Sequence, residues 1–213
     1  MNRTKRLVQL DVDSTFIQQE AIELLAAKAG VLEEVSGVTE AAMRGELDFE
    51  ESLRARVALL KGLQESAIVQ VQGEILLTDG AAELVNALHS KGHCVALVSG
   101  GFSDILKPLV ESLKIKHYKA NKLEIINGRL TGNVEGPIID RAAKADVLRL
   151  FATECDVDLI DTVAIGDGAN DLDMMAIAGV SIAFNAKPVV VEAADYSITE
   201  PSLRSVLTLI GEN

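Results

Sequence analysis

Two aspartates, Asp11 and Asp13, stand one residue apart at the end of a short apolar run that begins at Leu7. Such a run is typical of a buried strand, and a parallel strand delivers the side chains at its carboxyl end to a ligand crevice. Two carboxylates this close repel each other unless a cation or a shared proton relieves them. The pair therefore predicts a metal site, a nucleophile, or both.

Three later segments carry side chains that suit the same chemistry. Ser99-Gly100-Gly101 follows an apolar run and precedes a helical pattern, so its backbone N–H groups are available to an anion. Lys144 lies on the apolar stripe of a predicted helix, where a buried ammonium needs an anionic partner. The run 166–171, Gly-Asp-Gly-Ala-Asn-Asp, offers oxygen ligands for a hard cation. Each segment alone also fits an ordinary turn or a solvated lysine.

The spacing of apolar runs predicts an α/β fold, in which strands alternate with helices. Strands are expected over 7–10, 94–98, 161–165 and 180–184, and helices over 79–91, 103–113, 141–152 and 170–178. This pattern indicates a Rossmann-like parallel sheet with helices on both faces. Because both aspartate clusters follow strands of that sheet, they are expected at the same edge.

Two stretches depart from this alternation. Residues 17–75 show helical periodicity with little strand signal, which predicts a helical cap inserted after the first strand. Asn127-Gly128 lies between two extended segments, 118–126 and 129–134, which predicts a small β-hairpin insertion. The expected domains are therefore a core of residues 1–16 and 76–213 and a cap of residues 17–75.

Composition narrows the class of protein. The chain has 213 residues, of which 48% are hydrophobic, as in a globular protein. A net charge of −12 and an aromatic content of 3% argue against nucleic-acid binding. The apolar runs are too short for a membrane span or a signal peptide, which favours a cytoplasmic enzyme without membrane partners. Cys94 and Cys155 lack the spacing of metal ligands, so we expect buried or free thiols.

Taken in order, the four polar segments resemble the four motifs of the haloacid dehalogenase (HAD) superfamily of phosphatases. The segments 43–49, 56–63 and 183–188 further resemble the phosphoserine phosphatase family, in its short form without a regulatory domain. The likeness extends over essentially the whole chain. It implies a HAD core and the Mg²⁺-dependent hydrolysis of O-phospho-L-serine through an aspartyl-phosphate, the last step of serine biosynthesis.

The resemblance also implies a role for each matched residue. Asp11 would attack phosphorus, and Asp13 would donate and then accept the proton. Mg²⁺ would be held by Asp11, the Asp13 backbone carbonyl and Asp167. Asp171 would support the metal shell and Lys144. The phosphoryl oxygens would be held by Ser99, the Gly100 amide, Lys144 and Asn170.

Selection of an amino-acid phosphate requires one charge of each sign, because phosphoserine carries an ammonium and a carboxylate. The resemblance assigns these contacts to Glu20 and Arg56. Helical periodicity independently places both on apolar stripes, where a lone charge is costly unless it is paired. Two other arrangements would also explain charged residues on these stripes. The two side chains could form a mutual salt bridge, or their aliphatic parts could cover apolar surface where the two domains meet. The resemblance also implies that Met43 and Phe49 close the cap over the substrate, whereas the residues by themselves favour ordinary helix packing.

Two alternatives stay open at this point. The first is a HAD phosphatase or phosphotransferase acting on another small phosphomonoester, such as a homoserine- or histidinol-type substrate. The second is a receiver-type signalling protein that stores phosphate on an aspartate. Receivers are shorter, have no helical cap and lack an aspartate two residues after the nucleophile, so Asp13 argues against that class. The expected partner is a small-molecule substrate, and the chain is expected to be a monomer or a homodimer.

Overall fold

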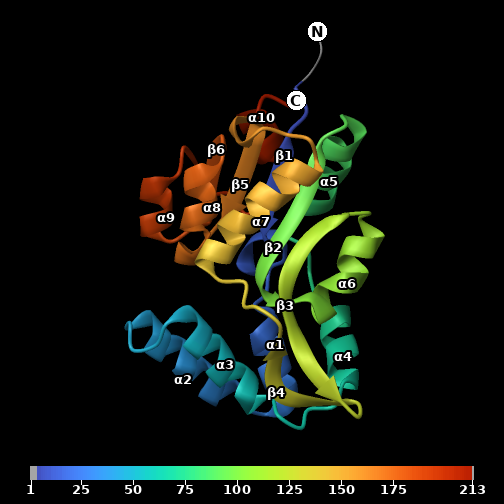
Figure 1. Ribbon diagram of the computed structural model, residues 1–213, viewed down its shortest axis with the longest axis vertical. Coiled ribbons are helices and arrows are strands. Elements are labelled where there is room, and N and C mark those ends of the chain that lie inside the picture. Colours follow the sequence, from blue (N-terminus) through green and yellow to red (C-terminus); the bar gives the residue numbers. More distant parts are fainter. Residues whose placement is uncertain (1–3, 213) are drawn as a thin grey trace.

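A seven-stranded sheet forms the centre of the molecule, with strand order β4-β3-β2-β1-β5-β6-β7 (Figure 1). The computed structural model describes residues 4–212, apart from the side chain of Met43. All neighbouring strands are parallel except β3 and β4. The strands are β1 (Leu7–Asp11), β2 (Cys94–Phe102), β3 (His117–Ile126), β4 (Arg129–Glu135), β5 (Thr162–Gly166), β6 (Val180–Phe184) and β7 (Tyr196–Ile198).

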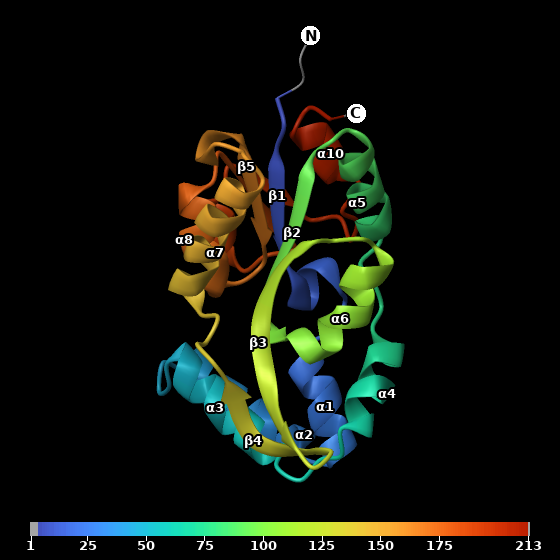
Figure 2. The ribbon, with the colours of Figure 1, turned by 45° about the vertical axis from the view of Figure 1, so that its right-hand side comes forward.

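Strand β1 lies in the middle of the sheet, between β2 and β5, and every one of its residues is buried. Val8 and Leu10 pack against α5 (Ala81–Ser90), α6 (Ser103–Ser112) and α10 (Ser205–Leu209). Leu7 faces the opposite cluster, formed by α7 (Arg141–Glu154), α8 (Leu172–Ile177) and α9 (Pro188–Ala193). Figure 2 shows these two helical layers on either side of the sheet. The predicted parallel α/β fold is therefore confirmed.

The chain leaves β1 through a tight turn, η1 (Val12–Phe16), and then forms four helices beyond the carboxyl end of the sheet. These are α1 (Ala21–Ala29), α2 (Leu32–Met43), α3 (Phe49–Leu59) and α4 (Ser66–Glu74). The segments that enter and leave this helical unit run side by side, since the Gln18 amide donates to the Leu76 carbonyl at 2.9 Å. The helical content expected for 17–75 is present, whereas the division into two domains stays a prediction.

The predicted hairpin forms around Asn127 and Gly128, both of which have positive φ angles, 52° and 72°. Such a pair is typical of the tight turn that matches the twist of the flanking strands. The hairpin extends the main sheet, because β3 also pairs with β2. Leu123 and Leu130 of the hairpin share one buried cluster with Leu53 of α3. The hairpin thus joins the sheet to the four helices.

Short elements near the end of the chain were not predicted. Strand β7 has only three residues, and α9 and α10 have six and five. Two single turns of 3₁₀ helix, η2 (Leu159–Asp161) and η3 (Ala169–Asp171), flank β5. The helix expected over 170–178 accordingly begins as η3 and continues as α8. Within residues 4–212, every helix is too short or too polar to cross a bilayer.

Candidate active site

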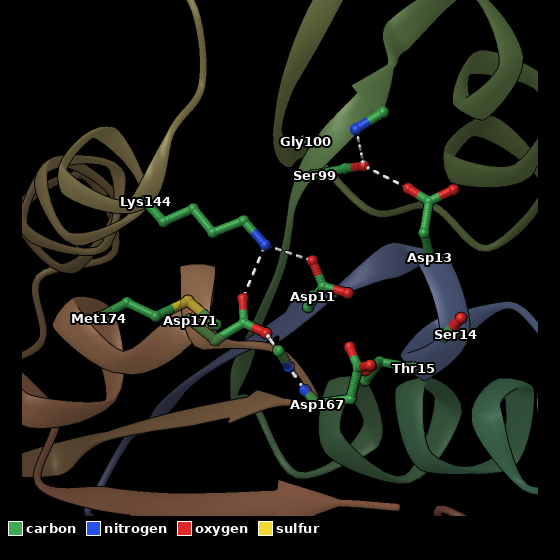
Figure 3. A network of polar contacts seen from close by, with 12 residues as sticks. Asp11, Asp13, Ser14, Thr15, Ser99, Gly100, Lys144, Asp167, Asp171 and Met174 are labelled. Atoms are coloured by element: carbon green, nitrogen blue, oxygen red, sulfur yellow. Dashed lines mark hydrogen bonds and ion pairs between the residues drawn. The ribbon is translucent and has the colours of Figure 1, made fainter. Parts of the chain in front are cut away.

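The Lys144 ammonium bridges two buried carboxylates at the carboxyl end of the sheet (Figure 3). Lys144 Nζ donates to Asp11 Oδ1 and, at 2.7 Å, to Asp171 Oδ1. Lys144 and Asp171 have no exposed surface, and Asp11 is 5% exposed. Asp140 caps helix α7, since its side chain accepts the Ala143 amide at 2.8 Å. This cap sets the start of α7 and turns Lys144 towards the sheet, as its place on the apolar stripe predicted.

Negative charge exceeds positive charge in this buried cluster. Burial raises the pKa of Asp11 well above its usual value; Lys144 opposes this effect, and Asp171 and Asp167 add to it. Burial and then the Asp171 carboxylate raise the pKa of Asp167 to about 6. Burial alone would lower the pKa of Lys144, but Asp11 and Asp171 outweigh it and raise that pKa. One ammonium does not neutralise three aspartates, so the cluster favours a further cation.

The geometry of the cluster fits a hard divalent cation. Carboxylate oxygens of Asp11, Asp167 and Asp171 lie within 4.8 Å of one another. Asp171 Oδ2 already accepts the amides of Asp167 and Gly168, each at 3.1 Å, and its Oδ1 accepts Lys144. Asp171 therefore organises the loop, whereas Asp11 and Asp167 keep oxygens that face the cavity. An all-oxygen set of this kind suits Mg²⁺ better than a softer metal.

Asp13 lies on the opposite side of Asp11 from Lys144, in the turn that follows β1 (Figure 3). Its Oδ1 accepts the Ala21 amide at 2.7 Å, at the first turn of α1, and its Oδ2 accepts the Ser99 hydroxyl at 2.8 Å. Ser99 is fully buried, and its oxygen also accepts the Gly101 amide at 2.7 Å. Two hydrogen bonds from different segments thus hold the Asp13 carboxylate in one orientation.

A cavity of about 730 Å³ lies between the sheet edge and helices α1 to α3. The side chains of Asp11, Asp13 and Asp167 line it from the sheet, together with Gly100 and Asn170. Ser99, Lys144 and Asp171 stand behind this surface. The structure therefore brings all the predicted residues of the sheet edge to one place.

Glu20 and Arg56 line the same cavity from the helical side. The Glu20 carboxylate borders the open cavity yet is crowded by protein, and this burial, with Asp13 next, raises its pKa to about 7. The Ser14 hydroxyl donates to Glu20 Oε1 at 2.7 Å. Burial lowers the pKa of Arg56, whose Nε donates to the Ser52 carbonyl at 3.2 Å. The structure, which describes both side chains, records no ion pair between Glu20 and Arg56, so the mutual salt bridge considered above is not formed.

Phe49 begins helix α3 and packs over Gly100 of β2. A Cβ placed on Gly100 would lie 2.8 Å from Phe49 Cζ, so only glycine leaves room for the ring. Asp48 caps the same helix and accepts the Glu51 amide at 2.8 Å, which fixes the position of Phe49 at the cavity wall. Met43 is the last residue of α2, and its side chain lies outside the described part of the molecule.

Sequence reasoning assigned no role to three polar residues in or beside the cavity, Ser14, Lys187 and Arg141. Ser14 orients Glu20, as described above. Lys187 lines the cavity, and its backbone amide donates to the Asp167 carbonyl at 3.0 Å. Arg141 also lines the cavity and pairs with Asp173. Lys187 precedes Pro188, the first residue of α9, and a proline that opens a helix after a strand was a signal for a residue at the sheet edge.

Comparison with known proteins agrees with this geometry. The family model of the haloacid dehalogenase-like hydrolases matches residues 8–176. A phosphoserine phosphatase of Streptomyces coelicolor is 56% identical over 98% of the chain, which spans about half (51%) of that relative's length. A phosphoserine phosphatase of Streptococcus thermophilus is 49% identical, and the match covers 100% of the chain and 99% of the relative.

A solved structure of a phospho-aspartyl intermediate analogue of phosphoserine phosphatase superimposes with a TM-score of 0.91. It is 42% identical in sequence, and the superposition covers 97% of this chain and 99% of the other. The extent of these matches, over the sheet and the four helices alike, identifies the family. The chain belongs to the haloacid dehalogenase-like hydrolases and, within them, to the phosphoserine phosphatase family.

Proposed function

We propose that the protein hydrolyses O-phospho-L-serine to L-serine and phosphate, with Asp11 as nucleophile and Mg²⁺ as cofactor. One observation carries the proposal. The same cavity is lined by aspartates at the sheet edge, with the Lys144 ammonium directly behind Asp11, and by two opposite charges, Glu20 and Arg56, on the helical side. Phosphoserine has the same arrangement, with a phosphate at one end and an ammonium and a carboxylate at the other.

At the sheet edge, the phosphoryl oxygens would be held by Ser99, the Gly100 amide, Lys144 and Asn170. Mg²⁺ would be held by Asp11, the Asp13 backbone carbonyl and Asp167, as members of the HAD family generally use a divalent metal. The bound ion would neutralise charge on the phosphoryl group and keep Asp11 ionised. Asp171 would act through its hydrogen bonds to Lys144 and to the loop that carries Asp167.

In the first step, a carboxylate oxygen of Asp11 attacks phosphorus, and the bond from phosphorus to the seryl oxygen breaks. The seryl oxygen takes a proton from Asp13, so serine leaves as a neutral alcohol. Lys144 donates a hydrogen bond to Asp11 before attack and holds the phosphoryl oxygens as their charge increases. The product of this step is an aspartyl-phosphate on Asp11.

In the second step, a water molecule attacks the phosphorus of the aspartyl-phosphate. Asp13 is now deprotonated and accepts a proton from that water, which restores the Asp11 carboxylate and releases inorganic phosphate. The Ala21 amide suits this double role because it holds the Asp13 carboxylate in both steps, whereas the single Ser99 hydroxyl proton would pass from Asp13 to a phosphoryl oxygen when the substrate binds. The second aspartate also explains why the intermediate turns over, whereas a receiver protein would retain it.

On the helical side, the Glu20 carboxylate would bind the substrate ammonium and Arg56 would bind its carboxylate. Met43 and Phe49 would cover the substrate and exclude water from the first step. Residues 17–75 would act as the cap that opens for serine to leave. The partner in this reaction is the small-molecule substrate, and the setting that we propose is the cytoplasm.

The test is phosphate release from L-phosphoserine with Mg²⁺ and again with a chelator. Rapid, repeated turnover that stops with the chelator and returns with added Mg²⁺ is expected. A panel of phosphothreonine, sugar phosphates and nucleotides, with and without acceptor alcohols, then tests the substrate. If phosphoserine were not preferred over that panel, the amino-acid assignment would fail although the phosphatase assignment would stand.

A further inference from the structure

Cys94, His117 and Cys155 lie together at the amino end of the sheet, away from the active site. Their side-chain sulfur and nitrogen atoms are within 4.8 Å of one another. The two thiols are close enough to hydrogen-bond. Cys94 begins β2, and Ser99 of the active site follows farther along the same strand, roughly 16 Å away at ~3.3 Å per residue. The two groups of ligands therefore belong to different sites.

The sheet register explains how residues so distant in sequence meet. Ala96 of β2 pairs with His117 of β3, so these two side chains point to the same face of the sheet. Cys94 stands two residues before Ala96 and shares that face. Helix α7 covers this face, and its C-terminal cap residue is Cys155, so the end of the helix brings the second thiol over the two strands. Neither strand spacing nor helix spacing alone reveals the group.

His117 is held in a defined orientation by two residues of α7. Its Nδ1 lies 3.0 Å from Glu154 Oε2, and its ring centre lies 5.3 Å from that of Phe151. When the Glu154 carboxylate accepts a hydrogen bond from Nδ1–H, the other ring nitrogen, Nε2, keeps a free lone pair. Histidines that ligate metals in proteins are oriented in this way by a carboxylate on the opposite nitrogen.

We propose that Cys94, His117 and Cys155 bind one Zn²⁺ ion, with water as the fourth ligand. Two sulfurs and one imidazole nitrogen are the ligand types that Zn²⁺ selects, whereas Mg²⁺ prefers the oxygen cluster at the other end of the sheet. Binding converts both thiols to thiolates and releases two protons to solvent, so the bound site carries no net charge before the Glu154 carboxylate is counted.

The burial of the three side chains indicates how the ion would reach the site and what its binding would do to the fold. The His117 side chain is 22% exposed and Cys155 is 2% exposed, so the ion enters beside the histidine and reaches the buried thiol last. Once bound, the ion links β2, β3 and the end of α7 directly. The bound ion would strengthen the contact between the sheet and α7, the helix that also supplies Lys144.

Cobalt provides the test, because Co²⁺ replaces Zn²⁺ and only thiolate ligands give it an intense near-ultraviolet charge-transfer band. The full chain, reduced and freed of metal, is titrated with Co²⁺ in the presence of Mg²⁺. We expect a band that saturates at one equivalent and is displaced by Zn²⁺. Cys94→Ala and Cys155→Ala should lose the band, and Glu154→Ala should weaken Co²⁺ binding by about tenfold or more.

Control variants distinguish metal binding at this site from metal binding at the active site and from disulfide formation between the two cysteines. His89→Ala, on the opposite face of the sheet, should keep the band that His117→Ala weakens, and Asp167→Asn should keep it because that residue offers only oxygen. If Cys155→Ala does not fold, the Co²⁺ titration of Cys94→Ala decides the question, because Cys94 is only half-buried. No band at saturating Co²⁺, or a Cys94–Cys155 disulfide that forms in air with Zn²⁺ present, would overturn the proposal.

Discussion

The ammonium of Lys144 lies 2.7 Å from the carboxylate of Asp171, and neither side chain has any exposed surface. A buried ion pair of this kind stabilises a fold poorly, because desolvation of both charges offsets their attraction. The ion pair instead serves to position the Lys144 ammonium. Asp171 fixes the ammonium on one side, so Lys144 is aimed at Asp11 on the other. The pair therefore places a permanent positive charge where a phosphoryl group is proposed to react.

Replacement of Lys144 by methionine, which has a similar length, is expected to lower kcat on the order of 100-fold or more. The metal-free variant should also be less stable, by about 3–5 kcal/mol, because two buried carboxylates lose their counter-ion. Mg²⁺ should restore part of that stability. Steady-state phosphate release and chemical unfolding with and without Mg²⁺ measure these effects. Lys107→Met, at an exposed position of α6, is the matched control and should change neither quantity.

Asp11→Asn is expected to abolish turnover while the fold is retained, because an amide oxygen is too weak a nucleophile for phosphorus. Burial already raises the pKa of Asp11 well above its usual value, so a neutral side chain of the same shape is tolerated at this position. Phosphate release and circular dichroism are the measurements. Asp146→Asn, an exposed carboxylate of α7, is the control. A well-folded Asp11→Asn protein with residual rapid turnover would reject the nucleophile assignment.

Arg56→Ala should raise KM for phosphoserine by roughly 10- to 150-fold, since a charge-assisted hydrogen bond to a carboxylate contributes about 1.5–3 kcal/mol. An aryl phosphate has no carboxylate, so its KM should change little. Arg54→Ala is a close control, because Arg54 lies on the same helix but pairs with Glu50 at the surface. Equal changes for both substrates would mean that Arg56 does not bind the substrate carboxylate.

Glu20 predicts a pH dependence of substrate binding. Because its pKa is raised to about 7, the carboxylate that would bind the ammonium is ionised above that pH and protonated below it. KM for phosphoserine should therefore rise as the pH falls below about 7, approaching tenfold per pH unit. An aryl phosphate shares the titration of the phosphate group but has no ammonium, so it corrects for that effect. Glu20→Gln should make the KM values of the two substrates change with pH in parallel.

The sheet edge was predictable from the sequence because its residues follow a strict local rule. Asp11 ends β1, Ser99 follows the apolar part of β2, and Asp167 follows β5. Because the strands are parallel, these positions lie at the same edge of the sheet. Lys144 was predictable from its place on an apolar stripe, which the structure confirms by its complete burial. The resemblance to a known family then supplied the roles that spacing alone leaves open.

Other features depend on contacts between distant segments. The hairpin at Asn127 was predicted, but its pairing with β2 rests on a register that no local pattern encodes. Ser14 was missed because its hydrogen bond to Glu20 requires a positive φ angle of 59° in the turn after β1. The Cys94–His117–Cys155 group was missed for the same reason as the hairpin pairing, since its members meet only after the sheet has formed.

Gly101 is expected to be essential for the position of Asp13. A Cβ at this residue would lie 2.6 Å from Asp13 Oδ2 and 3.0 Å from Ser99 Oγ, so Gly101→Ala must push the carboxylate away from its place. A displacement of about 1 Å costs on the order of 100-fold in rate, and the loss should appear in kcat because Asp13 acts in the chemical steps. Gly73→Ala is the matched control, since a Cβ there meets nothing within 4 Å; it should keep full activity and stabilise α4 by about 0.5–1 kcal/mol. If Gly101→Ala retained the kcat of the unmodified protein, the fixed orientation of Asp13 would not matter for catalysis, and its assignment as the proton carrier would have to be withdrawn.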